Sequence, residues 1–295
     1  YTVMDERGVV EDNLTFVFIL QACSMVMVHA QLMYQDIGYI IHDKTLKKGF
    51  FSDLFISSTL VSMYGKCQAL VMESENVFSA MCEHTVASWN AMLCVYVEHG
   101  MGEKALQLYA QVNKRGVFND KSTIITALQA CAVLVKEERN FLAVDQYTKV
   151  RIALELGHAL HANSRREGSE GDSDIRSTLI SLYGKCGAIT EAENVFGTLF
   201  QRDVVAWNAM LAAYVEQGMA EKALHLYRQM HEERVIIDQL MFVIAIQACS
   251  TLAEKQEGDL IKMASLEIGK SLHADARRGG FESGPFMFSS IVYMY

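Results

Sequence analysis

The chain has 295 residues, of which 51% are hydrophobic and 21% are charged, so it has enough apolar surface to bury a core and does not have the composition of a disordered tail. It holds one proline, Pro285, and the near absence of this helix-breaking residue favours an all-α fold. The formal net charge of −9 argues against a protein that coats duplex nucleic acid by charge alone. It does not exclude base recognition by neutral side chains, because stacking and hydrogen bonding to splayed bases need no net positive charge.

The seven cysteines form an odd set in which no two have the spacing of a CxxC pair. The pattern indicates neither a disulfide framework nor a zinc knuckle, and it favours reduced thiols in a reducing compartment. The seven are Cys23, Cys67, Cys82, Cys94, Cys131, Cys186 and Cys249.

The histidines give no metal-binding pattern. His158 lies three residues before His161, and His42, His161 and His273 recur along the chain, but no acidic or thiol partner recurs with them at ligand spacing. The sequence also lacks an HxE followed by PCxxC, a phosphate-binding glycine loop and a nucleophile elbow. We therefore predict a protein that is not an enzyme, with no catalytic residue, no metal and no cofactor.

One uncharged stretch, residues 14–34, has about the length of a membrane-spanning helix. Its core ILQAC recurs as ALQAC at 127–131 and as AIQAC at 245–249, where charged residues follow sooner. The stretch also contains the polar residues Gln21 and His29. We interpret it as a buried helix of a repeat and predict no membrane partner.

The chain repeats itself. TLVSMYGKC at 59–67 returns as TLISLYGKC at 178–186, a shift of 119 residues. WNAMLCVYVEHGMGEKALQLY from Trp89 returns as WNAMLAAYVEQGMAEKALHLY from Trp207, a shift of 118 residues. Self-similarity of this kind is the signature of a repeat array.

Each repeat unit is predicted to be a helical hairpin. One helix carries apolar residues at three- and four-residue spacing, namely Trp207, Met210, Leu211 and Tyr214. Gly218 ends it, and a second helix follows with Ala223, Leu224, Leu226, Tyr227 and Met230. Because two short helices bury too little surface to be stable alone, successive pairs must stack into a superhelix with a concave face.

These motifs resemble the pentatricopeptide repeat (PPR) family, in particular its plant type, in which standard, long and short units alternate. Standard units carry SWNAML or AWNAML and EKAL, short units LVSMYGKC or LISLYGKC, and long units QAC followed by His42, His161 or His273. In chain order, the predicted units are a partial standard unit at 1–12, long at 13–53, short at 54–85, standard at 86–120, long at 121–172, short at 173–203, standard at 204–238, long at 239–284 and a partial short unit at 285–295. We therefore predict an all-α, right-handed superhelical solenoid of helix-turn-helix repeats, with seven recognisable hairpins and truncated ends.

Two features depart from the family pattern. From cysteine to histidine the long units span 19, 30 and 24 residues, more than expected, so we predict insertions and the least regular structure at about 24–37, 132–155 and 250–267. The sequence also begins and ends inside units, so we expect that a targeting leader or a C-terminal catalytic extension would lie outside it.

In this family one base is read mainly by the fifth residue of a unit together with its last residue. An amide or hydroxyl can hydrogen-bond a base edge, and an acid can accept from that edge or orient its neighbour. The resemblance therefore implies uracil readers at Asn90 with Asp120 and at Asn208 with Asp238. It also implies a weak guanine preference for Ser177 with Asp203, a pair of unassigned preference at Ser58 with Thr85, and a pair cut short at Ser289.

The second residue of a unit is the expected stacking position. It is apolar at Phe55, Ala87 and Val205, which we assign to base stacking, and also at Leu14 and Leu240. Asp174 takes this place in the second short unit and puts base binding there in doubt. The fifth residues of the long units cannot hydrogen-bond a base and are expected to be spacers; they are Val17, Ile125 and Val243.

Each of these residues has a structural alternative. An asparagine after tryptophan can be a solvated or capping side chain. Trp89 and Trp207 are interpreted as packing between helices rather than as base platforms. The recurrent Cys23, Cys131 and Cys249 are interpreted as small apolar packing residues.

The sequence leaves three interpretations of the protein open. The resemblance implies a sequence-selective binder of single-stranded RNA in organelle RNA processing, in mitochondrion or chloroplast, serving as an RNA editing specificity factor with editing-complex proteins as further partners. The alternative is a helical-repeat scaffold for protein–protein interaction, for which the charge of −9 suits a basic partner. A third reading, from the uneven insertions, is a degenerate gene product that folds poorly.

Overall fold

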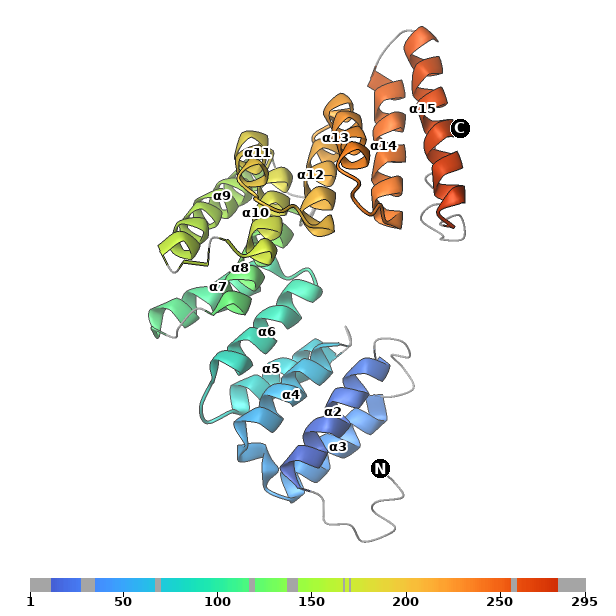
Figure 1. Ribbon diagram of the computed structural model, residues 1–295. Helices are drawn as coiled ribbons and strands as arrows, with labels where there is room; N and C mark the ends of the chain where they lie inside the picture. Colours follow the sequence, from blue (N-terminus) through green and yellow to red (C-terminus); the bar gives the residue numbers. More distant parts are fainter. Residues whose placement is uncertain are drawn as a thin grey trace. The chain divides into compact units, whose positions relative to one another are not determined.

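The computed structural model describes residues 12–27, 35–66, 70–116, 120–136, 143–166, 168–169, 171–255 and 259–280. These residues form α-helices, one short 3-10 helix at Phe50–Ser52 and turns, and contain no strand (Figure 1). The predicted all-α solenoid of helix-turn-helix repeats is confirmed. The helices are α2 (Asn13–Met27), α3 (Gln35–Lys47), α4 (Leu54–Gly65), α5 (Val71–Ala80), α6 (Val86–Glu98), α7 (Gly102–Lys114), α8 (Lys121–Lys136), α9 (Ala143–Arg166), α10 (Ser173–Lys185), α11 (Ile189–Gly197), α12 (Val204–Glu216), α13 (Ala220–Glu232), α14 (Gln239–Lys255) and α15 (Asp259–Arg278).

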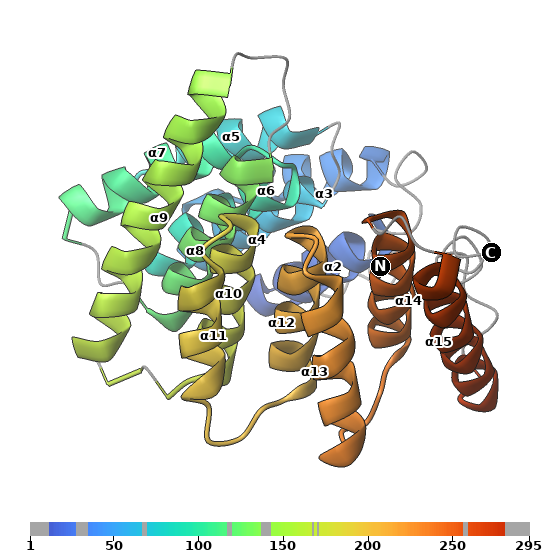
Figure 2. The same cartoon turned by 90° about the horizontal axis from the view of Figure 1, so that it is seen from above.

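The chain divides into two compact parts, residues 1–137 and 138–295, which are described separately. In the first part α2, α4, α6 and α8 pack side by side in chain order, and α3, α5 and α7 each pack on the helix before them. In the second part α10, α12 and α14 follow one another in the same way, with α11, α13 and α15 packed on them, and α9 contacts α10 (Figure 2). Each part is therefore a stack of hairpins whose first helices form one continuous layer.

The segments expected to be irregular are largely helical. Residues 24–27 continue α2, residues 132–136 and 143–155 belong to α8 and α9, and α14 and α15 take up most of 250–267. The remaining residues of these segments, 28–34, 137–142 and 256–258, lie outside the described residues. For the described residues the prediction of irregular structure was wrong, because the extra residues lengthen helices, as in the 24-residue α9 with its helix-forming sequence IALELGHALHA.

The uncharged stretch at 14–34 is a repeat helix as far as the structure describes it. Residues 14–27 belong to α2, in which Phe16 and Leu20 are fully buried. Residues 28–34 lie outside the described residues. No helix in the described part of the chain combines the length and the apolar character needed to cross a membrane.

Glycines end the first helices of the standard units. Gly100 and Gly218 have φ of 71° and 66°, in the left-handed region that favours glycine. The next backbone N–H closes the helix by bonding back to a tyrosine carbonyl, from Met101 to Tyr96 at 2.8 Å and from Met219 to Tyr214 at 2.7 Å. This geometry turns the chain sharply into the second helix.

Both tryptophans pack between helices, as predicted. Trp89 and Trp207 are buried and meet the rings of Phe78 and Phe196 edge to face, each at 5.0 Å between centroids. The guanidinium of Arg202 lies over the Trp207 ring. The indoles are therefore packed in the protein and are not base platforms.

A carboxylate ties each standard unit to the unit before it. Glu75 accepts hydrogen bonds from the Tyr96 hydroxyl at 3.0 Å and from the Lys104 ammonium at 2.7 Å. Glu193 accepts the equivalent bonds from Tyr214 at 2.9 Å and from Lys222 at 2.8 Å. The recurrence of one network in both parts shows that it belongs to the repeat architecture.

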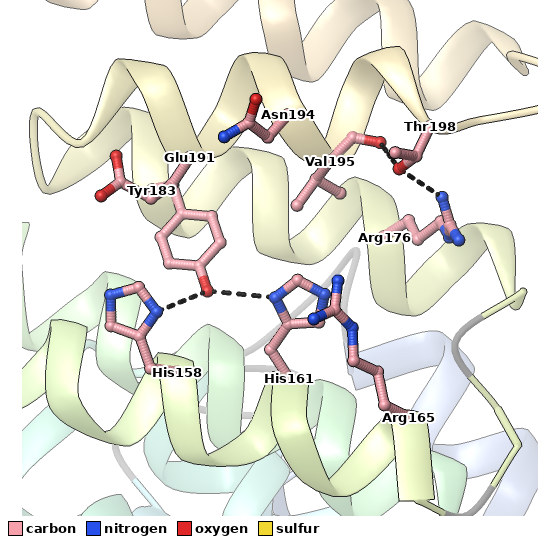
Figure 3. A pocket seen from close by; sticks show the side chains of 9 residues that line it. All are labelled: His158, His161, Arg165, Arg176, Tyr183, Glu191, Asn194, Val195 and Thr198. Carbon is pink, nitrogen blue, oxygen red and sulfur yellow. Dashed lines mark hydrogen bonds between the residues drawn. The ribbon is translucent and has the colours of Figure 1, made fainter.

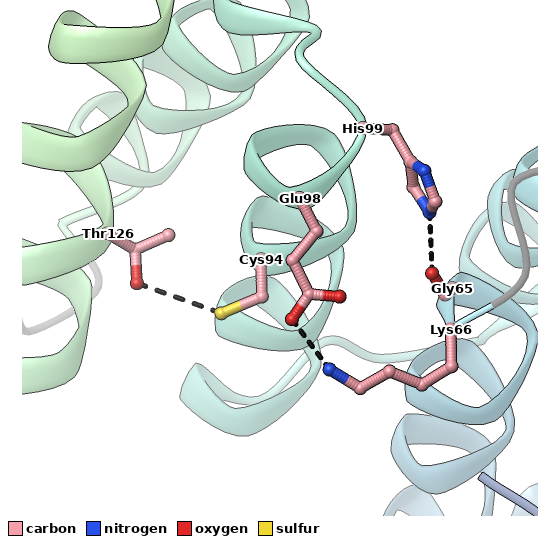
Figure 4. A network of polar contacts seen from close by, with 6 residues as sticks. All are labelled: Gly65, Lys66, Cys94, Glu98, His99 and Thr126. Carbon is pink, nitrogen blue, oxygen red and sulfur yellow. Dashed lines mark hydrogen bonds and ion pairs between the residues drawn. The ribbon is translucent and has the colours of Figure 1, made fainter. Parts of the chain in front are cut away.

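Successive first helices approach closely at a glycine. A Cβ on Gly65 would lie 2.1 Å from Cγ2 of Val95, and one on Gly184 would lie 2.4 Å from Cβ of Ala213. The carbonyl oxygen of Gly65 lies 2.6 Å from Nε2 of His99, next to an ion pair between Lys66 and Glu98 (Figure 4). In the second part the Gln217 amide donates to the Gly184 carbonyl at 3.0 Å. The close contact between helices thus explains the glycine of the GKC sequence that recurs at 65–67 and 184–186.

Candidate nucleic-acid interface

The last residue of each predicted unit from 1–12 to 204–238 caps the helix that follows. A side-chain oxygen at this position accepts a hydrogen bond from the backbone N–H two or three residues ahead, at 2.8 to 3.2 Å. This capping role was not predicted, although Asp or Thr directly before a helix is a capping signal in the sequence. Recurrence of an acid at this position therefore does not by itself indicate base reading. The capping residues are Asp12, Asp53, Thr85, Asp120, Asp172, Asp203 and Asp238.

The structure brings together both predicted asparagine and aspartate pairs. The Asn90 amide donates to Oδ1 of Asp120 at 3.1 Å, and the Asn208 amide donates to Oδ2 of Asp238 at 3.0 Å. Each aspartate is held in place by its capping bond, so it fixes which way the amide nitrogen of its partner points. Within each pair the two residues lie 30 positions apart in sequence, and the helical hairpin brings them into contact.

The carboxylate of Asp120 is stabilised in its ionised form. Partial burial acts to raise the pKa of this carboxyl, but the hydrogen bonds from Thr123 and Asn90 outweigh it, and the pKa lies below the usual value of 3.8. Asp120 therefore stays an acceptor at neutral pH.

The two serine pairs are not brought together by a hydrogen bond in the same way. The hydroxyl of Ser58 donates to the carbonyl of Leu54 at 2.6 Å, and that of Ser177 donates to the carbonyl of Ser173 at 2.8 Å. Both serines are buried, and their partners Thr85 and Asp203 act as helix caps. Ser289 lies outside the described residues.

The second residues of the units form a series of exposed apolar side chains. The exposed fraction is 61% for Leu14, 60% for Phe55, 59% for Val205 and 53% for Leu240, and Ala87 is also exposed. Isolated apolar side chains are common on surfaces, but these recur at one repeat position. They lie three residues before the fifth position and so share a helix face with it.

The departures within this series are also visible. Asp174 is exposed where the other units have an apolar side chain. Val17 and Val243, at the fifth position of long units, are buried, and Ile125 is partly buried. These aliphatic side chains have no donor or acceptor for a base edge.

The recurrent histidines pair with tyrosines of the next unit. His42 Nδ1 lies 3.0 Å from the Tyr64 hydroxyl, and in the second part His158 and His161 both lie 3.3 Å from the Tyr183 hydroxyl (Figure 3). Since a hydroxyl has one proton, at least one of these two imidazoles must donate to Tyr183. Burial raises the pKa of Tyr183 to about 12.

The cavity beside Tyr183 is of mixed charge. Arg165, Arg176 and Glu191 line it, and the Arg176 guanidinium donates to the Thr198 hydroxyl at 2.9 Å. Among the described residues no three or more His, Cys, Asp or Glu side chains are placed to hold a metal ion. These contacts give the histidines a packing role between α9 and α10.

Comparison with known proteins identifies the repeats. Residues 87–117 and 176–204 match the family described as PPR repeat, and residues 202–251 match the PPR repeat family. The pentatricopeptide repeat-containing protein At1g03540 of Arabidopsis thaliana is 30% identical over 258 residues, which cover 88% of this chain and 38% of that protein. The chain belongs to the pentatricopeptide repeat family.

Other relatives in the family have similar coverage. The chloroplastic pentatricopeptide repeat-containing protein At5g55740 of Arabidopsis thaliana is 29% identical over the whole of this chain, which covers 31% of its length. The chain thus spans about a third of the curated PPR proteins that it matches. Among solved structures, the PPR protein PPR10 in complex with an 18-nt psaJ RNA element matches with a TM-score of 0.38 at 14% identity, covering 99% of this chain and 49% of that one.

Proposed function

We propose that this PPR chain binds single-stranded RNA and reads about one base with each standard unit. One observation carries the proposal, and it recurs in both standard units. An asparagine lies three residues after an exposed apolar residue, and its amide is held by an aspartate that caps the next helix. An apolar side chain can stack on a base while the amide bonds its edge. Ala87 and Val205 take the stacking place, and Asn90 and Asn208 the reading place.

The asparagine keeps the hydrogen-bonding capacity that a base edge needs. An amide nitrogen has two protons and an amide oxygen has two lone pairs, so one bond to aspartate leaves a donor and an acceptor. The edge of uracil offers an acceptor next to a donor, which is the complementary pattern. We therefore assign uracil to Asn90 with Asp120 and to Asn208 with Asp238.

The finer parts of the proposal rest on the family. We assign the chain to organelle RNA processing, in chloroplast or mitochondrion, and to the alternating plant type that provides specificity for RNA editing. The division into standard, long and short units belongs to this proposal. Pairs at Ser177 with Asp203 and at Ser58 with Thr85 are assigned a weaker contribution, because their hydroxyls already bond their own helices.

Selection from a randomised RNA pool tests the proposal. The parent should enrich RNAs with two uracils separated by two positions, because the two standard units are three units apart. Asn90→Thr and Asn208→Thr together should shift both positions towards guanine, each by about 1 kcal/mol for one hydrogen bond. The matched control is Asn76→Thr with Asn194→Thr, which changes two exposed asparagines in α5 and α11 and should leave the selected RNAs unchanged.

Failure would favour the protein-binding alternative. If the pool gave no enrichment, or if the double threonine variant selected the same RNAs as the parent, base reading would be abandoned. The net charge of −9 would then direct the search to basic peptides.

A further inference from the structure

The surroundings of the two reading asparagines differ in one hydrogen-bonding residue. The third residue of the helix that follows each standard unit is Thr123 in α8 and Met241 in α14. Both side chains are buried. The two helices differ at several positions, but Thr123 is the one that bonds the asparagine of the preceding unit, so it is compared with Met241.

Thr123 holds the asparagine oxygen. Its hydroxyl lies 2.7 Å from Oδ1 of Asn90 and 2.7 Å from Oδ1 of Asp120. The single hydroxyl proton can bond only one of them at a time. The Asn90 amide is therefore held at both ends, with its nitrogen on Asp120 and its oxygen beside the hydroxyl of Thr123.

Met241 provides no such donor. Among the described residues Oδ1 of Asn208 is a buried oxygen without a hydrogen-bond partner. Asn208 as a whole is 9% exposed, and Met241 is fully buried. A buried acceptor without a donor is unfavourable, so the amide of Asn208 gains by turning its oxygen towards any donor that arrives.

We propose that Thr123 and Met241 are positioning residues that set how strictly each standard unit distinguishes uracil from cytosine. This inference rests on the proposed RNA binding and deepens it. The two pyrimidines have the same shape, but cytosine carries an amino donor where uracil carries a carbonyl acceptor. Their discrimination therefore depends on which end of the amide faces the base.

The 86–120 unit discriminates more strongly between uracil and cytosine. Its amide cannot turn without losing bonds at both ends, so it keeps one orientation for uracil. In the 204–238 unit only Asp238 holds the amide. Because the torsion about an asparagine amide is otherwise broad, this amide can turn. This unit prefers uracil by a smaller factor and accepts cytosine more readily.

The test uses the RNA selected from the randomised pool by the parent chain, with uracil or cytosine at each of the two assigned positions. Thr123→Val removes the hydroxyl at nearly constant volume and should lower the ratio of uracil to cytosine affinity at the 86–120 position about fivefold, the effect of one hydrogen bond. Met241→Thr should raise that ratio at the 204–238 position. Each variant should leave the other position unchanged.

A matched control and a second measurement separate positioning from general damage. Thr126→Val removes another buried hydroxyl of α8, which bonds the Ser122 carbonyl at 2.8 Å, and should change neither ratio. NMR relaxation of the side-chain amides should show Asn90 more ordered than Asn208 in the parent, with Thr123→Val reducing the order of Asn90.

The outcomes distinguish the two proposals. A parent that shows no base preference at either position refutes the proposed function and this inference with it. A parent that prefers uracil, but whose ratio at the 86–120 position is unchanged by Thr123→Val, overturns the inference alone. A uracil preference that weakens there, with an ordered amide that becomes mobile, supports it.

Discussion

The units at 86–120 and 204–238, each with the helix that follows it, share the WNAML and EKAL motifs and differ at other positions, some of which change their interior. Both keep the buried tryptophan, the glutamate that joins tyrosine and lysine, and the asparagine bonded to a capping aspartate. They differ in the residues that surround these features: Gly102 and Ala220, His99 and Gln217, Thr123 and Met241. Where an equivalent contact can form, the scaffold tolerates the exchange, whereas Thr123 bonds the side-chain oxygen of Asn90 and Met241 leaves that of Asn208 without a partner.

The largest difference in stability is expected at the first helical residue of α7 and α13. A Cβ on Gly102 would lie 2.6 Å from the backbone nitrogen of Leu134, which no side-chain rotation can relieve. Gly102→Ala should therefore cost about 2 to 3 kcal/mol by forcing α7 away from α8, measured by urea unfolding. Ala220→Gly, the reverse exchange, should cost about 1 kcal/mol or less. Equal losses would show that the close approach at Gly102 is not specific to this unit.

Changes at the capping aspartates separate capping from base reading. Asp120→Ala and Asp238→Ala should each cost about 1 kcal/mol, because alanine cannot cap the next helix. Serine caps as well as aspartate, but its shorter side chain does not hold the asparagine, so Asp120→Ser and Asp238→Ser should keep more of the stability than the alanine variants.

The serine variants then report on RNA directly. They should lose preference for uracil at the assigned positions while their melting temperature stays close to that of the parent. If they select the same RNAs as the parent, the aspartates act as helix caps and nothing more.

His99 and Gln217, which bond the carbonyls of Gly65 and Gly184, should be interchangeable. Gln217 already makes in the second part the contact that His99 makes in the first, so His99→Gln should be neutral. His99→Ala and Gln217→Ala should each cost about 0.5 kcal/mol, since a partly buried carbonyl loses its partner. Chemical unfolding of the three variants in parallel measures this; a neutral Gln217→Ala would show that solvent replaces the amide.

Sequence was sufficient for the fold class because the evidence was local. Apolar spacing around Trp207, a glycine at the helix end and the repetition of both motifs each indicate a helical hairpin. The long-unit insertions were misjudged because a fixed family spacing treats additional residues as loop, whereas α9 shows that a helix can absorb them.

The site could be predicted only in part. Asn90 with Asp120 was found by matching positions, and the structure joins the two by a hydrogen bond. Thr123 was missed because its contact with Asn90 joins residues 33 apart that no motif links. Aligning the two units would have pointed to this position, since Thr123 and Met241 are equivalent in that alignment. The capping role of Asp120 was also visible, in its place directly before α8.

The smallest expected effect concerns the ionisation of Asp120, which Thr123 and Asn90 help to stabilise. Its pKa lies below 3.8 in the folded chain, since hydrogen bonds outweigh the opposing effect of burial. A carboxyl whose pKa is depressed by folding contributes stability above its unfolded pKa, and this contribution is lost as the pH falls through the folded value. Thr123→Val removes the hydroxyl, whose single proton is shared between the Asn90 oxygen and the Asp120 carboxylate, but it keeps the backbone bond, so the pKa of Asp120 should rise part of the way to its usual value. Carboxyl carbon shifts followed by NMR between pH 2 and pH 6 measure this directly.

Thr126→Val should leave the titration unchanged. An unchanged pKa of Asp120 in Thr123→Val would mean that the hydroxyl proton of Thr123 points to Asn90 and not to the carboxylate. Thr123 would then hold the amide of Asn90 and have no part in stabilising the ionised Asp120.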